Sequence, residues 1–152
     1  HPDSYVVRTA WLYSRYGANF AKTMMRRAAA GAPVRVVDDQ VGQPTHAVDL
    51  AEHIIELVNA GAPFGTYHGT NSGAASWYDF AREIYRLAAC DVSLVTPVPS
   101  TEYPTRAVRP ANSVLRHART VAAEVAEMRT WDAALEAEFA DIIEAVRTEA
   151  AS

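Results

Sequence analysis

The side chains best suited to bind a ligand gather in residues 36–51. Gln40, Gln43 and Thr45 carry hydrogen-bond donors and acceptors that could contact the polar edge of a small molecule. β-Branched residues precede them and apolar residues at helical spacing follow, so the segment is predicted to be a loop between a strand and a helix. A polar loop held between two rigid elements is typical of a binding site. The alternative is that these side chains satisfy only the backbone of the loop itself.

Two further segments carry recognition residues. Trp11, at the end of a predicted strand, could offer the apolar face of its indole to a sugar ring, or it could pack in the core. Arg109 precedes a proline and stands close to Asn112, and a guanidinium presented by a rigid loop suits a phosphate group. Its alternative is an ordinary surface salt bridge. Trp77 and Trp131 lie on apolar helical stripes and are predicted to be core residues.

The sequence offers no catalytic machinery, and we assign no catalytic residue within it. It lacks the glycine-rich turn that a dinucleotide pyrophosphate needs. Its single lysine, Lys22, follows Ala18 by four positions, so there is no Tyr-x-x-x-Lys pair for proton transfer. His46, Asp49 and His53 fall on one helix face, yet we expect solvent-facing or loop-bonded side chains there rather than a metal site.

Strand and helix signals alternate along the chain, which predicts an α/β fold. Strands are expected over residues 5–13, 34–37 and 64–70. The expected helices run from an Asn19 cap to Gly31, from about residue 50 to Gly61, from a capping box at Ser76 and Asp79, near Thr120, and from Thr130 onward. Prolines predict that residues 91–109 are extended or looped.

Composition and charge limit the classes of function that this chain can have. The 152 residues, 49% hydrophobic and 21% charged, are ordinary for one globular domain, here residues 1–152. A net charge of -4 argues against a general nucleic-acid binder, and no apolar run approaches the roughly 20 residues of a membrane span. The single cysteine, Cys90, fits a reducing, cytoplasmic compartment. Residues 136–152 predict an acidic helix whose charges face solvent rather than a partner.

Four segments together resemble the C-terminal half of the dTDP-4-dehydrorhamnose reductase family, which belongs to the extended short-chain dehydrogenases/reductases. They are residues 7–13 (Val-Arg-Thr-Ala-Trp-Leu-Tyr), 36–45 (Val-Val-Asp-Asp-Gln-Val-Gly-Gln-Pro-Thr), 76–81 (Ser-Trp-Tyr-Asp-Phe-Ala), and 102–104 with 109–115 (Glu-Tyr-Pro and Arg-Pro-Ala-Asn-Ser-Val-Leu). The resemblance covers residues 5–135. It departs from the family pattern at His46, where an aromatic residue such as tyrosine is usual, and over residues 116–119.

The resemblance implies that this chain is the substrate-binding part of a Rossmann-like enzyme whose N-terminal coenzyme domain is missing. That domain would hold NADPH and the Tyr-x-x-x-Lys pair, so the chain alone is expected neither to bind NADPH nor to turn over substrate. The family can use Mg²⁺, but no ligands for it are assignable here. The partners implied are a dTDP-sugar and the missing Rossmann domain. Apolar surface left uncovered by that domain predicts a homo-oligomer.

Site residues follow from the same resemblance. Trp11 would face the deoxysugar, and Arg109 would face the pyrophosphate. The loop that would line the nucleotide-sugar cleft contributes Gln40, Gly42, Pro44 and Thr45. Asn112 shares the loop of Arg109, while Thr9 and Ala10 would lie near the nicotinamide end of the cofactor.

The activity implied for the parent enzyme is reduction of the C4 ketone of dTDP-4-dehydro-L-rhamnose with NADPH, giving dTDP-L-rhamnose. Two alternatives stay open. One is a non-catalytic regulatory subunit of the same fold, which could contact a partner through the acidic last helix. The other is a reductase or epimerase for a different 4-keto sugar nucleotide, because fold and cleft would look alike in that case.

Overall fold

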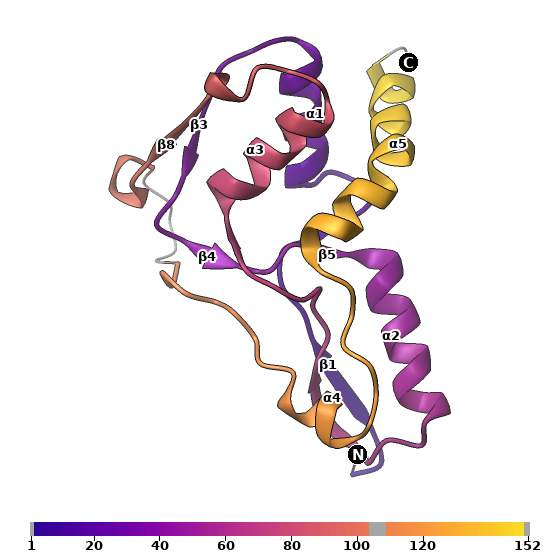
Figure 1. The fold of residues 1–152 in the computed structure, drawn as a ribbon. Helices are drawn as coiled ribbons and strands as arrows, with labels where there is room; N and C mark the ends of the chain where they lie inside the picture. Colours follow the sequence, from indigo (N-terminus) through magenta and orange to yellow (C-terminus); the bar gives the residue numbers. More distant parts are fainter. Residues whose placement is uncertain (1, 104–108, 151–152) are drawn as a thin grey trace.

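The computed structural model describes residues 2–103 and 109–150, and strands and helices alternate along it as expected for an α/β fold (Figure 1). The strands are β1 (Tyr5–Arg8), β2 (Leu12–Tyr13), β3 (Val34–Val37), β4 (Val41–Gly42), β5 (Thr45–His46), β6 (Gly65–His68), β7 (Ala75–Ser76) and β8 (Val95–Val98). The helices are α1 (Phe20–Ala29), α2 (Ala47–Asn59), α3 (Trp77–Leu87), α4 (Ala118–Ala122) and α5 (Trp131–Ala150), with 3₁₀ turns η1 (Val92–Leu94) and η2 (Ser100–Glu102).

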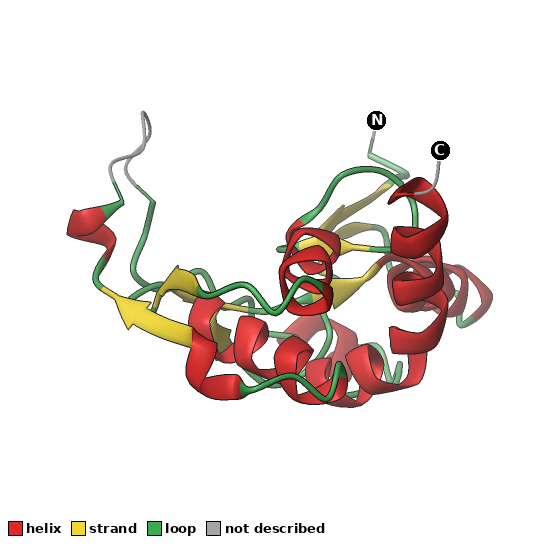
Figure 2. Cartoon of the chain, turned by 90° about the horizontal axis from the view of Figure 1, so that it is seen from above, coloured by secondary structure: helices red, strands yellow, loops and turns green. Residues whose placement is uncertain are grey.

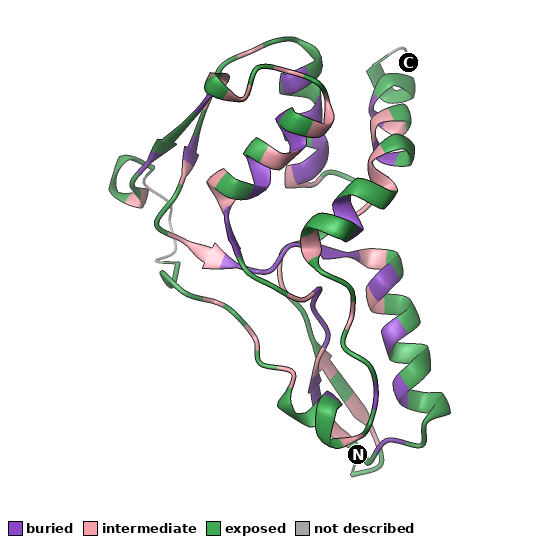
Figure 3. Cartoon of the chain, viewed as in Figure 1, coloured by how far each residue is buried: buried purple, intermediate pink, exposed green. Residues whose placement is uncertain are grey.

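The elements form two regions, each with its own apolar cluster. In one region β3 and β8 lie beside α1, α3 and α5, and their buried residues make the larger cluster. In the other, β1 and β6 lie beside α2 and α4 around Leu57 and Tyr67. The buried positions follow these inner faces of the helices (Figure 3). Among the residues described, no helix combines the length and the apolar character that a bilayer crossing requires.

The strands pair two by two. β1 with β6, β2 with β5, and β3 with β8 are parallel, whereas β4 with β7 is antiparallel. β8 lies within residues 91–109 and confirms the extended backbone predicted there. Pro97 is tolerated because it sits opposite Val36 on a two-stranded ladder. η2, just past β8, projects at the edge of the molecule in both views (Figures 1 and 2). Pro104, which contributed to that expectation, lies outside the described residues.

The prediction of one strand over residues 5–13 is wrong in one respect. The backbone of Trp11 has φ 45°, in the left-handed region, so the strand divides into β1 and β2. β-Branched and aromatic residues predict extended backbone locally, but here contacts of the Trp11 side chain hold a conformation that costs about 1–2 kcal/mol for a residue with a Cβ.

The predicted helix caps at Asn19 and Ser76 are confirmed, whereas α2 begins at Ala47, before the expected residue 50. The Asn19 side chain accepts a hydrogen bond from the Lys22 backbone N–H, and Ser76 and Asp79 form the expected capping box. The acidic last helix is partly paired within the chain, since Glu149 contacts Arg26 and the fully buried ammonium of Lys22. α5 is thereby tied to α1.

Asp49 ties α2 to the segment that leads into α5. Its carboxylate accepts hydrogen bonds from Arg129 at 2.7 and 2.8 Å and from the Asn71 amide at 2.7 Å. The expectation of solvent-facing or loop-bonded side chains is therefore confirmed for Asp49, which is bonded to two loop residues. It is wrong for His46 and His53 in that neither faces solvent, because both are buried. The guanidinium of Arg129, 80 positions away in sequence, covers this helix face. Helical spacing alone does not reveal such a distant partner.

The pH dependence of stability follows from the Asp49 contacts. Burial raises the pKa of Asp49, but the hydrogen bonds from Arg129 and Asn71 outweigh burial and the net shift is downward. A lowered carboxyl pKa stabilises the fold above about pH 4, and this contribution is lost as the pH falls through the pKa of Asp49 in the folded protein.

We expect Arg129→Met to lower the free energy of unfolding by roughly 1–3 kcal/mol at neutral pH, because it leaves the buried Asp49 carboxylate without its main partner.

Urea denaturation at several pH values checks this expectation. Asp49→Asn should be less stable than the wild type at neutral pH and should lose less stability between about pH 5 and about pH 2. Equal acid sensitivity of the two proteins would show that Asp49 does not carry the effect. Arg147→Met, which removes an exposed arginine of α5, is the control.

Candidate functional site

Two adjoining hollows lie beside the polar loop of residues 36–51. The smaller, of about 200 Å³, is lined by Ala10, Trp11, Gln40, Trp77, Arg109, Pro110 and Ser113. The larger, of about 430 Å³, is lined by Phe20, Met24, Arg35, Val36, Val37, Gln40, Trp77, Tyr103 and Arg109. Gln40, Trp77 and Arg109 line both, so the two hollows are parts of one cleft.

Backbone pairing brings the Arg109 loop to this cleft. The Val41 N–H donates to the Ala111 carbonyl at 2.8 Å, and the Ser113 N–H donates to the Val41 carbonyl at 2.9 Å. Gln43 is buried, and its Oε1 accepts a 2.7 Å hydrogen bond from the Leu115 N–H. Segments 72 positions apart in sequence are thus joined, and Gln40 and Arg109 come to line the same hollows.

The Trp11 indole is held between two partners. Its ring stacks on Trp77 with centroids 3.6 Å apart and planes 10° apart. A Cβ on Gly42 would lie 2.5 Å from Cε2 of Trp11, 2.7 Å from Cζ2 and 2.8 Å from Nε1. If Gly42 approached within the plane of the indole, its Cβ would lie nearer to Cζ2 and Nε1 than to the ring-junction atom Cε2. Because Cε2 is the nearest atom, Gly42 lies against the face of the indole opposite Trp77. Both faces are covered in part, while Trp11 remains half-buried and borders the smaller hollow.

The cleft gathers some of the residues predicted to form the site. Ala10, Trp11, Gln40 and Arg109 border the smaller hollow together. Thr9 is exposed and does not line either hollow.

The remaining predicted residues lie around the cleft and have contacts within the chain. Pro44 and Thr45 are buried, and the Thr45 N–H donates to the Trp11 carbonyl at 3.2 Å, which joins β5 to β2. Asn112 is exposed, and its Oδ1 accepts a 2.9 Å hydrogen bond from the Val114 N–H, as in an Asx turn. Gly42 supports Trp11. These four residues shape the loops that carry Gln40 and Arg109.

Trp77 packs against the larger apolar cluster, as expected for a core residue, but the sequence did not assign it to the cleft. It is half-buried and lines both hollows, because the capping box starts α3 at the residue that faces Trp11. Trp131 is half-buried too and packs edge-on against Phe80. The larger hollow has an apolar wall formed by Phe20, Met24 and Tyr103, which were not among the predicted site residues. An apolar residue beside a helix cap is the signal that could have pointed to Phe20 and Trp77.

The charges around the cleft favour an anion. Arg35 is paired with Glu102, whereas no carboxylate within residues 2–103 and 109–150 forms an ion pair with Arg109. The exposed Arg109 guanidinium therefore presents its positive charge where the two hollows meet. Such a group can bind a phosphate or pyrophosphate through paired N–H donors.

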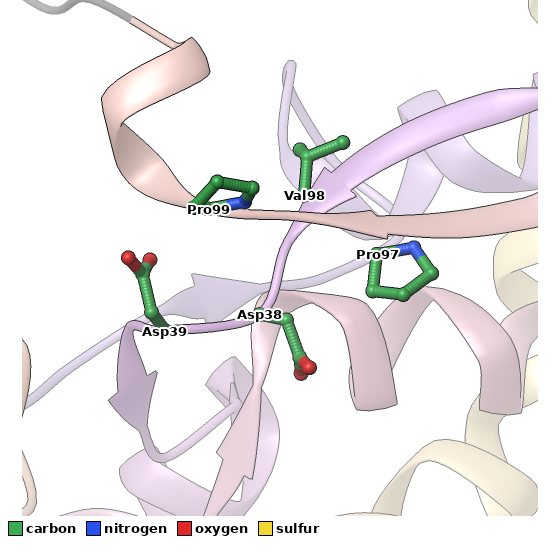
Figure 4. A pocket seen from close by; sticks show the side chains of 5 residues that line it. All are labelled: Asp38, Asp39, Pro97, Val98 and Pro99. Carbon is green, nitrogen blue, oxygen red and sulfur yellow. The ribbon is translucent and has the colours of Figure 1, made fainter.

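A separate hollow of about 300 Å³, between the ends of β3 and β8, has the opposite character (Figure 4). Asp38 and Asp39 line it; Asp39 accepts 3.0 and 2.9 Å hydrogen bonds from the Ser100 N–H and hydroxyl, and these bonds lower the pKa of Asp39. Asp38 accepts from the Ser76 hydroxyl. The two carboxylates of this hollow repel a phosphate.

Among the described residues, no three His, Cys, Asp or Glu side chains are grouped so that they could hold a metal ion.

Gly42→Ala tests the contact with Trp11. Since a Cβ would meet the ring at 2.5 Å, we expect Trp11 to be displaced and the fold to lose roughly 1–3 kcal/mol. Thermal denaturation and tryptophan fluorescence measure the two effects. In a Trp11→Ala background the same glycine substitution should add almost no further loss, because the clashing ring is gone. A full additional loss there would show that the glycine is needed for another reason.

Comparison with known proteins gives a consistent result. The sequence matches the family model described as the RmlD substrate binding domain over residues 1–144. A dTDP-4-dehydrorhamnose reductase of Streptomyces griseus is 45% identical over 143 residues, covering 91% of this chain and 47% of the relative. A probable dTDP-4,6-dihydroxy-2-methyloxan-3-one 4-ketoreductase of Streptomyces antibioticus is 44% identical over 144 residues, covering 95% and 49%.

Solved structures agree with these relatives. The crystal structure of a dTDP-4-dehydrorhamnose reductase from Clostridium acetobutylicum superposes with a TM-score of 0.84 at 42% identity, covering 92% of this chain and 49% of that one. The Bacillus anthracis enzyme in complex with NADP gives 0.84 at 38% identity, covering 90% and 48%. The chain spans about half the length of the curated relatives it matches. By its sequence and its fold, this chain belongs to the RmlD substrate binding domain family.

Proposed function

We propose that this chain is the nucleotide-sugar-binding part of an NADPH-dependent reductase that converts dTDP-4-dehydro-L-rhamnose to dTDP-L-rhamnose. The observation that carries the proposal is the placement of Arg109, whose guanidinium borders both hollows and has no ion pair with a described carboxylate. A dTDP-sugar has this order of parts: an apolar-faced deoxysugar, a doubly charged pyrophosphate and a nucleoside.

Each part of the ligand has a matching surface. The deoxysugar would occupy the smaller hollow, beside Trp11 and Gln40. The pyrophosphate would lie at Arg109, and the thymidine would occupy the larger hollow, where Phe20 and Tyr103 offer aromatic surface. The reductases named among the relatives and solved structures support this class of ligand, because their names specify dTDP-linked sugars.

Hydride transfer would need the half of the reductases that this chain does not span. NADPH would supply the hydride, as the NADP complex of the Bacillus anthracis relative suggests. The residues described here bind and orient the sugar, so that its C4 carbonyl faces the coenzyme. The chain alone is therefore expected neither to bind NADPH nor to turn over substrate. We assign no Mg²⁺ ligands, and a cytoplasmic location is part of the same proposal.

Exposed apolar residues mark where the coenzyme domain would dock. Val6 and Leu12 on the first two strands are 51% and 48% exposed, and Ile55 and Val58 on α2 are 58% and 53% exposed. Exposed apolar side chains on strands and helices are candidates for burial by another domain. A second copy of the chain could cover these residues when the coenzyme domain is absent.

A different 4-keto sugar nucleotide is the second candidate substrate. A dTDP-4-keto-6-deoxy-D-glucose reductase of Streptomyces niveus is 46% identical over 137 residues, as similar as the rhamnose-forming relatives. Those two substrates differ in the sugar and share the nucleotide, so the larger hollow and Arg109 would serve both. The regulatory-subunit alternative receives less support, because the relatives quoted above are named as reductases.

Calorimetric titration of the purified chain tests the proposal. We expect dTDP-L-rhamnose to bind, and Arg109→Ala to weaken binding about 10- to 100-fold, because a charge-assisted hydrogen bond contributes roughly 1.5–3 kcal/mol. Arg86→Ala, which removes an exposed arginine paired with Glu83 on α3, should leave binding unchanged. A dTDP-6-deoxy-D-hexose used in parallel separates the two candidate substrates. Equal binding of dTDP-L-rhamnose to the wild type and Arg109→Ala would contradict the assignment of the pyrophosphate to Arg109.

A further inference from the structure

We propose that Trp77 is a positioning residue that fixes the Trp11 indole at the wall of the sugar hollow. The inference rests on the proposed function, in which Trp11 borders the deoxysugar, and it adds a role for a residue that faces both hollows. Trp77 acts through Trp11 rather than through the reacting atoms.

The first support is the conformation of Trp11. Its backbone occupies the left-handed region at φ 45°, which a side chain with a Cβ adopts only when its surroundings hold it there. The hydrogen bond from the Thr45 N–H to the Trp11 carbonyl fixes the backbone but leaves the ring free to rotate. The ring is fixed by Trp77, which lies parallel to it at 3.6 Å, and by Gly42 on the other face.

The second support is that Trp77 is itself rigidly held. It is the first residue of α3, directly after the Ser76 cap, whose side chain and that of Asp79 bond each other's backbone N–H groups. The Phe20 ring packs against Trp77 with centroids 4.7 Å apart and planes inclined by 55°. Three aromatic rings from three separate segments therefore form one cluster, and Trp77 is its middle member, stacked on Trp11 and inclined to Phe20.

The third support is the location of Trp77 between the two hollows. Phe20 borders only the larger hollow and Trp11 only the smaller, whereas Trp77 borders both. A shift of Trp77 would move the walls of the sugar hollow and the nucleoside hollow together. Trp131 offers a comparison, because it also starts a helix and is half-buried, but it borders neither hollow.

Fluorine NMR of the chain labelled with 5-fluorotryptophan tests the positioning without any ligand. The three tryptophans give three resonances, which Trp→Phe variants at each position assign. We expect Trp77→Leu to broaden or divide the Trp11 resonance, because the ring would sample several orientations. Trp131→Phe is the matched control and should leave that resonance single and sharp. A single sharp Trp11 line in Trp77→Leu, whatever its chemical shift, would overturn the proposal.

Titration with dTDP-L-rhamnose tests the consequence for binding. We expect Trp77→Leu to raise the dissociation constant about tenfold, and Trp77→Phe, which keeps an aromatic stack, to restore most of the affinity. Unchanged or tighter binding by Trp77→Leu would overturn the proposal, since a Trp11 ring fixed by Trp77 would then contribute nothing to holding the ligand. If the wild type does not bind, the proposed function fails, and the NMR result alone decides whether Trp77 positions Trp11. Circular dichroism confirms that each variant is folded.

Discussion

The contact of the Trp11 ring with the backbone of Gly42 is the constraint on which the rest of the site depends. Only a residue without a Cβ lets the ring approach this closely. At the same residue the backbone is left-handed, the first strand ends, and β2 pairs with β5 beyond the break. The other face of the ring then receives Trp77, which brings the start of α3 to the same place. Local strain is thus offset by aromatic packing beside the cleft.

The two sides of the polar loop of residues 36–51 differ in charge. The chain carries a net charge of -4, yet the cleft beside Trp11 presents the Arg109 guanidinium. The carboxylates of Asp38 and Asp39 lie in a separate hollow, where serine donors engage them. A pyrophosphate is therefore attracted to one side of the loop and repelled from the other. Backbone hydrogen bonds between Val41 and the Arg109 loop keep this arrangement in place.

Features set by neighbouring residues could be predicted from the sequence, and features set by distant residues could not. The Asn19 cap, the Ser76 capping box and the β3 strand depend on local chemistry, and all three were predicted. The break at Trp11 depends on Gly42, and the burial of Asp49 depends on Arg129, so propensity and helical spacing missed both. Of the residues predicted to form the site, Trp11, Gln40 and Arg109 border one hollow. Trp77 was not predicted to line the cleft, because its position on an apolar helical stripe indicates a core residue.

The central claim is that the two hollows form one cleft for a dTDP-sugar, joined at Arg109. A crystal structure of this chain with dTDP-L-rhamnose tests it most directly. We expect the pyrophosphate at Arg109, the deoxysugar in the hollow beside Trp11, and the thymidine between Phe20 and Tyr103. A ligand bound in the hollow of Asp38 and Asp39, or one whose pyrophosphate lies away from Arg109, would contradict it.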